Sequence, residues 1–129
     1  MTVSASDFFE SAQAMLANGS NIDLRNAISR SYYAAYHDAI RVADQFCEDV
    51  NSNSRMGSHE RLSERFKGCA AFQKGKAWAY TLQYLKMWRH KADYHLNDKV
   101  SQTDAETHVR TAERFLRELA ETSDVVATG

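Results

Sequence analysis

Apolar residues recur every three or four positions through most of the chain, which is the period of an amphipathic α-helix. Five segments carry this pattern, and none alternates convincingly with the two-residue period of a β-strand. The pattern therefore predicts an all-α fold, an antiparallel bundle of four to five helices over residues 1–121. Residues 122–129 are expected to form a frayed C-terminal tail. The expected helices cover residues 4–17, 23–50, 58–67, 75–96 and 103–121.

The second segment has the widest apolar face and is predicted to be the central helix. Polar stretches mark the expected ends of the segments: Asn18-Gly19-Ser20 after the first and the loop 51–54 after the second. Thr103 and Glu106 have the spacing of a capping box at the start of the last. The two apolar rows of the second segment are Ile28, Tyr32, Ala35, Ala39, Val42 and Phe46, and beside them Tyr33, Tyr36, Ile40, Ala43 and Cys47.

Composition narrows the class of protein. The chain has 129 residues, which suits one domain, and its 43% hydrophobic content argues against disorder. The net charge of −1 is uneven, because residues 55–91 hold nine Lys or Arg and two Glu. This excess suits an anion-binding surface and a solvated surface facing acidic helices about equally.

No apolar stretch is long enough to span a membrane and no secretory signal is evident, so a cytoplasmic location is expected. Cys47 and Cys69 form no CxxC motif and are expected to be unpaired thiols.

Arg89 does not fit the apolar row in which it lies. Leu85 precedes it by one helical turn and Ala92 follows it by one turn. A buried charge costs several kcal/mol unless it is paired or solvated. Arg89 is therefore expected either to face a cleft or a subunit seam, or to form an internal ion pair. The candidate partners are Asp38, Asp44 and Asp93.

His95 ends the same segment, and His90 lies between it and Arg89. Six residues on a regular helix leave Arg89 and His95 about 120° apart, so they share a site only if the helix end bends or a two-fold dimer brings two copies together. The five-residue spacing of His90 and His95 does not suit a zinc site, and we predict no metal. The chain has no nucleotide-binding glycine motif, and no cofactor is predicted. The other histidines are expected to be structural or exposed: His37, His59 and His108.

Several motifs together resemble one family. Residues 25–37, RNAISRSYYAAYH, are similar to an SRxYYAxxH signature, and residues 89–94, RHKADY, to an RxxADY segment. His59, Leu62 and Phe66 fit an H-x-x-hydrophobic-x-x-x-F stretch. These motifs resemble a branch of the HEPN family, helical domains of prokaryotes associated with nucleotides and RNA.

The resemblance implies a helical bundle that is usually a homodimer, and it implies a chemistry. Many HEPN proteins are metal-independent endoribonucleases in which four to six residues separate a motif arginine from a motif histidine. Arg89, His90 and His95 match this motif and are the expected catalytic residues, with Lys86 and Lys91 holding the RNA backbone. The imidazole would move the 2′-OH proton and the guanidinium would hold the phosphate, giving a 2′,3′-cyclic phosphate.

The same resemblance implies partners. The expected role is the toxin or effector of a toxin–antitoxin or phage-defence pair, with RNA as substrate and a nucleotidyltransferase antitoxin as partner. One toxin group carries a modified tyrosine two residues after the motif histidine, and that position here is Asn97. Two alternatives stay open: a non-catalytic binding partner of a small nucleotidyltransferase, and a structural dimerisation domain.

Overall fold

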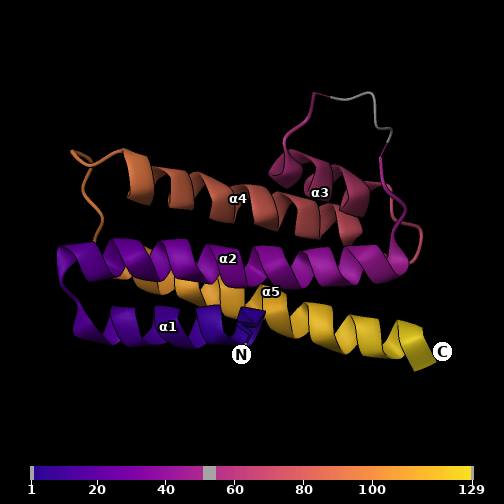
Figure 1. The fold of residues 1–129 in the computed structure, drawn as a ribbon, viewed down its shortest axis with the longest axis horizontal. Coiled ribbons are helices and arrows are strands. Elements are labelled where there is room, and N and C mark those ends of the chain that lie inside the picture. The colour runs from indigo at the N-terminus through magenta and orange to yellow at the C-terminus, as the bar shows by residue number, and fades with distance from the viewer. Residues whose placement is uncertain (1, 51–54, 129) are drawn as a thin grey trace.

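The computed structural model describes residues 2–50 and 55–128, and within these ranges it contains five helices and no strand. The all-α bundle predicted from the sequence is confirmed. Figure 1 shows α1 and α4 running opposite to α2 and α5, with α3 lying beside the first half of α4. The helices are α1 (Ala5–Asn18), α2 (Asn21–Phe46), α3 (Ser58–Lys67), α4 (Gly75–Tyr94) and α5 (Gln102–Thr128).

The central position predicted for the second helix is confirmed, because α2 packs against each of the other four helices. Its first apolar row is buried from Ile28 to Val42, and from Tyr32 onward it meets Trp78 and Leu85 of α4 and Phe115 of α5 in one core. Each large side chain buried in this way stabilises the fold by roughly 1.5–3 kcal/mol. The core therefore fixes the face that α2 and α4 present to each other.

Two helices end earlier than predicted. The helix expected to reach residue 50 stops at Phe46, because Cys47 is extended and its carbonyl accepts a hydrogen bond from Arg65. The helix expected to reach residue 96 stops at Tyr94, and Leu96 beyond it is 73% exposed. The expected loop at 51–54 lies outside the described residues.

The last helix differs from the prediction at both ends. Its capping box joins Ser101 and Asp104 rather than Thr103 and Glu106: each side chain bonds the other's backbone N–H at 3.0 Å. The segment predicted to be a frayed tail is helical to Thr128, because it still buries apolar surface. Ser123 is buried and Val126 packs against the main core.

Cys47 and Cys69 form a disulfide, so the prediction of unpaired thiols was wrong. The pairing was not visible in the sequence because it depends on α3 folding back against the end of α2. Disulfides are rare in reducing compartments, so this pair does not support the predicted cytoplasmic location. No helix within the described residues is long and apolar enough to cross a membrane.

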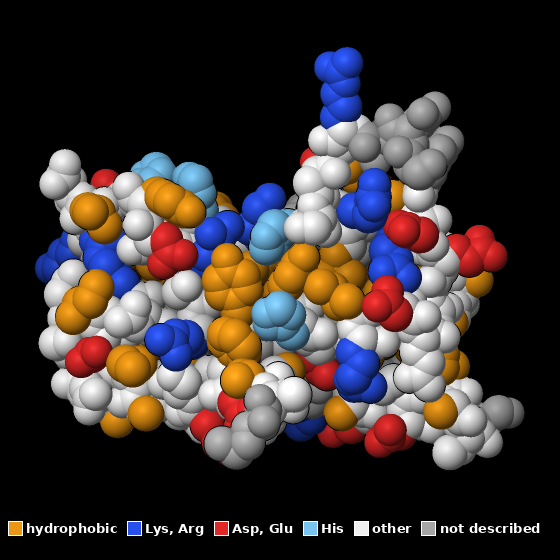
Figure 2. All heavy atoms as spheres, in the orientation of Figure 1, with side chains coloured by type: hydrophobic (Ala, Val, Ile, Leu, Met, Phe, Trp, Pro, Cys, Tyr) orange, Lys and Arg blue, Asp and Glu red, His pale blue; other side chains and the backbone are white. Residues whose placement is uncertain are grey.

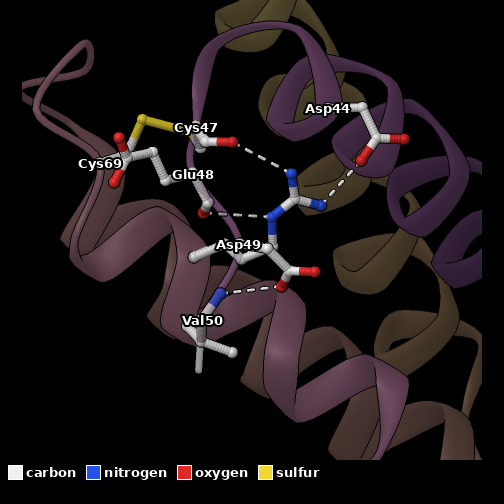
Figure 3. A network of polar contacts seen from close by, with 7 residues as sticks. Asp44, Cys47, Glu48, Asp49, Val50 and Cys69 are labelled. Atoms are coloured by element: carbon white, nitrogen blue, oxygen red, sulfur yellow. Dashed lines mark hydrogen bonds and ion pairs between the residues drawn. A yellow bond between two sulfur atoms is a disulfide. The ribbon is translucent and has the colours of Figure 1, made fainter. Parts of the chain in front are cut away.

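Arg65 of α3 reinforces the same junction. Its guanidinium donates to the Asp44 carboxylate at 2.8 Å and to the Cys47 carbonyl at 3.1 Å, in the network drawn in Figure 3. At the same end of α3, Gly75 begins α4 so close to the Phe66 carbonyl that a Cβ would lie 2.2 Å from its oxygen. Any side chain at position 75 would therefore separate α3 from α4. Helix α3 is thus fixed against both neighbours.

Candidate functional site

Arg89 lies on the face of α4 that packs against α2, as its place in the apolar row predicts. It is 9% exposed. Its guanidinium carbon lies 5.6 Å from the ring centre of Tyr32, 5.8 Å from that of Tyr33 and 5.9 Å from that of Tyr94. Aromatic faces attract a cation, which offsets part of the cost of removing the guanidinium from water.

Only one of the three candidate carboxylates lies near Arg89. Asp93 Oδ2 is 3.8 Å from Arg89 Nη1 and also accepts a hydrogen bond from Ser29 at 3.2 Å. Asp38 pairs with Arg41, and Asp44 pairs with Arg65. The Nε atom of Arg89 is buried and has no hydrogen-bond partner among the described residues. The ion pair with Asp93 is therefore long and leaves part of the guanidinium unused.

His90 and His95 lie together at the C-terminal end of α4, with ring centres 5.2 Å apart. His95 is the first residue beyond the helix, and its Nδ1 lies 3.5 Å from the Asp98 carboxylate. Its side chain is 52% exposed. The Tyr94 ring lies 4.9 Å from that of His90 and is also a neighbour of Arg89. Within the described part of one chain, the two histidines come together but neither has a direct interaction with Arg89.

Arg25 of α2 fixes the bend that follows α4, and sequence reasoning missed it. It is 6% exposed, and its guanidinium donates to the carbonyls of Ala92 at 2.9 Å and His95 at 3.2 Å, and also to Asp98. These bonds satisfy carbonyls that a helix end leaves free. The signal was present, because Arg25 precedes Ile28 by one turn in the buried row of α2, as Arg89 follows Leu85.

A second cluster surrounds His59, which was expected to be merely structural or exposed. Its Nδ1 is hydrogen-bonded to the Tyr32 hydroxyl, and its ring stacks on Tyr36 with centres 4.4 Å apart. Burial lowers the pKa of His59, and the positive charges of Lys86 and Arg89 lower it further. Burial also raises the pKa of Tyr32. His59 is therefore neutral at neutral pH, and its Nδ1 can accept a hydrogen bond from the Tyr32 hydroxyl.

The two lysines expected to hold RNA lie in different surroundings. Lys86 lines a hollow together with Tyr32 and His59, whereas the Lys91 ammonium lies 4.7 Å from the ring centre of Trp88. On the face shown in Figure 2, hydrophobic side chains gather in the middle, with histidine and Lys or Arg side chains beside them. Lys86 and Lys91, which are five residues apart in the sequence, thus lie in two different environments.

The described residues contain no group of three or more His, Cys, Asp or Glu side chains arranged to hold a metal ion. His108 is fully buried and bonded through both ring nitrogens, to Ser31 and to the Leu85 carbonyl. Besides carboxylates, the polar side chains at these two clusters are imidazole, guanidinium, ammonium and phenol groups. This set suits proton transfer and the binding of anions.

Compared with known proteins, the chain matches no family model, no curated protein and no solved structure.

Proposed function

We propose that this chain is a metal-independent endoribonuclease of the HEPN type that acts as a symmetric homodimer. The observation that carries the proposal is the pair of imidazoles at the end of α4, His90 and His95, with ring centres 5.2 Å apart. Two neighbouring imidazoles suffice for the acid and base steps of RNA cleavage.

The reaction needs one proton acceptor and one proton donor. One imidazole takes the proton of the 2′-OH while the 2′-oxygen attacks phosphorus, and the other gives a proton to the departing 5′-oxygen as the P–O5′ bond breaks. The products are a 2′,3′-cyclic phosphate and a 5′-OH end. Asp98 lies 3.5 Å from His95 Nδ1, close enough to orient that ring.

Arg89 is proposed to stabilise the negative charge of the transition state, since its buried Nε is unpaired. In a single chain Arg89 faces α2 and has no direct interaction with the histidines. A dimer formed through the exposed face of α4 would place His90 and His95 of two copies along one seam, with Arg89 acting on the phosphate through its charge from the α2 side and not by contact. Met87, at 58% exposed, and Tyr94, at 66%, offer the apolar surface for it. The proposed biological role is the toxin or effector of a toxin–antitoxin or phage-defence pair.

The test is cleavage of a labelled RNA by the purified protein in the presence of EDTA. We expect cleavage to persist in EDTA and to fall by about 100-fold or more in His95→Ala and His90→Ala, the range that acid–base catalysis contributes. His37→Ala removes an exposed histidine of α2 and should leave the rate unchanged. Cleavage that requires a metal ion, or that survives both substitutions, would contradict the proposal.

A second candidate is a non-catalytic binding partner of a small nucleotidyltransferase. It is favoured by the burial of Arg89 and by the apolar side chains exposed nearby, Met87, Tyr94 and Leu96. It predicts that RNA stays intact, that a nucleotidyltransferase encoded beside this chain co-purifies with it, and that Leu96→Asp disrupts the complex. Binding that persists in Leu96→Asp would count against this surface.

A further inference from the structure

A hollow of about 210 Å³ lies where α2, α3 and α4 meet. Drug-sized ligands occupy pockets of roughly 300–1,000 Å³, so this one suits a small charged group better than a whole nucleotide. Two leucines, Leu62 and Leu82, form its apolar part. Its polar lining consists of Tyr32, His59, Glu60, Ser63, Gln83 and Lys86.

The His59 ring is oriented as a donor. In the tautomer that we assign to His59, the Tyr32 hydroxyl, which burial keeps protonated, donates to Nδ1. The neutral imidazole then carries its own proton on Nε2. Because Tyr36 stacks on the same ring, the orientation is fixed from a second side. Nε2–H is the donor that His59 retains for a ligand.

The charges around the hollow favour an anion. Lys86 lines it directly, and Arg89 lies above the Tyr32 ring with its guanidinium carbon 5.6 Å from the ring centre. Arg89 is nine-tenths buried, and its Nε has no partner among the described residues. Glu60 is the one carboxylate in the lining, and as an exposed residue it is well solvated. Asp93, 3.8 Å from Arg89, offsets part of the guanidinium charge, so Lys86 in the lining supplies most of the positive potential of the hollow.

We propose that this hollow binds one phosphate group, with His59 Nε2–H and the Lys86 ammonium as direct donors and Arg89 as electrostatic support. The phosphate belongs either to a free nucleotide or to an RNA strand. If the phosphate is part of an RNA strand, the site extends the proposed nuclease function and rests on it. If the phosphate belongs to a free nucleotide, the site is independent of that function.

The experiment follows the His59 ring resonances by NMR while three probes are added to the full chain. These are inorganic phosphate, adenosine 5′-monophosphate, and a short 2′-O-methyl oligoribonucleotide, which lacks the 2′-OH nucleophile and cannot be cleaved. We expect saturable shifts of the His59 ring with all three. The tightest probe identifies the source of the phosphate. If the His59 ring is unmoved by all three, the proposal is wrong.

Three substitutions, each of which removes a single charge, make the test specific to the hollow. Lys86→Gln should weaken phosphate binding about tenfold, since one hydrogen bond to a charged group is lost. Glu60→Gln should tighten it a few-fold by removing a repelling charge. Lys76→Gln, on an exposed position of the same helix α4, should leave it within about twofold. If Lys76→Gln and Lys86→Gln weakened phosphate binding equally, the phosphate would be attracted by the overall charge of the protein, and the proposed site would be wrong.

His59→Ala, in which binding is followed by backbone amide resonances of α3 in place of the missing ring, should weaken phosphate binding about as much as Lys86→Gln. If His59→Ala does not fold, Lys86→Gln and Glu60→Gln still decide the question, because both are read on the intact ring. The two proposals fail separately. Phosphate binding without RNA cleavage would leave this site standing and remove the nuclease, whereas cleavage without any shift of His59 would do the reverse.

Discussion

Arg25 and Arg89 lie at comparable places on two packed helices, and both are more than nine-tenths buried, yet their surroundings differ. Arg25 donates to the side chain of Asn21 and to backbone carbonyls at the end of α4. Arg89 has one carboxylate at 3.8 Å, three tyrosine rings near it and a buried Nε without a partner. A structural arginine is satisfied by the fold, whereas Arg89 keeps donor capacity that the fold does not use.

The same contrast separates two histidines. His108 uses both ring nitrogens inside the core, with Ser31 Oγ at 2.8 Å and the Leu85 carbonyl at 3.0 Å. His59 uses one nitrogen, toward Tyr32, and lines a hollow. Burial lowers the pKa of both rings, so burial alone does not tell a structural group from a functional one. The two rings differ in that His108 uses both nitrogens for the fold and His59 uses one among the described residues.

The largest expected effect is on Arg25. Arg25→Met keeps the aliphatic stem but leaves the carbonyls at the end of α4 without their donor. We expect a loss of roughly 3–4 kcal/mol in the free energy of unfolding, since several buried or half-buried acceptors lose their partner together. Chemical denaturation followed by circular dichroism measures it. Arg41→Met on the same helix removes an exposed arginine paired with Asp38 and should cost less than about 1 kcal/mol.

Removing the disulfide should have the next largest effect on the free energy of unfolding, and it should also disturb the cluster around His59. Cys47 and Cys69 are 22 residues apart, and a cross-link of that span stabilises a fold by about 3 kcal/mol through the unfolded chain. Replacing both cysteines by serine should lower the free energy of unfolding by that amount. It should also weaken the Tyr32–His59 bond, because α3 carries His59. If a reductant leaves the wild-type denaturation midpoint unchanged, the disulfide does not stabilise the protein.

Acid should destabilise the protein through His108. Its pKa is lowered from 6.5 to about 4 in the folded state, chiefly by burial. Between those values His108 is protonated in the unfolded chain but not in the folded protein. The free energy of unfolding therefore falls as the pH drops from about 6.5 toward about 4. The loss is at most about 3 kcal/mol. His108→Gln should flatten this part of the stability curve. A slope unchanged by that substitution would assign the acid loss to other groups.

The sequence predicts the helices because their apolar rows follow the core closely, and α3 is predicted at both of its ends. Helix ends decided by tertiary contacts are not predictable in this way: Arg25 determines the end of α4, and Arg65 with the disulfide that of α2. Arg89 was found because a charge broke an apolar row. The His59 hollow could not be found, since it forms only when three helices meet.

The smallest expected effect on stability completes the comparison of the two arginines. Arg89→Met should change the free energy of unfolding by less than about 1 kcal/mol, or raise it. The substitution exchanges a long ion pair and an unpaired Nε for apolar contact with Tyr32 and Tyr33. Asp93, whose side chain is 31% exposed and bonded to Ser29, can do without the arginine.

Denaturation of Arg89→Met beside Arg25→Met tests this directly, because the same side-chain exchange is made in two buried rows. The activity assay should give the opposite ranking: phosphate binding and RNA cleavage should fall sharply in Arg89→Met, whereas its stability hardly changes. A loss of stability as large as that of Arg25→Met would mean that the fold depends on Arg89. The unpaired Nε would then be no sign of function, and the phosphate hollow would lose its electrostatic argument from Arg89.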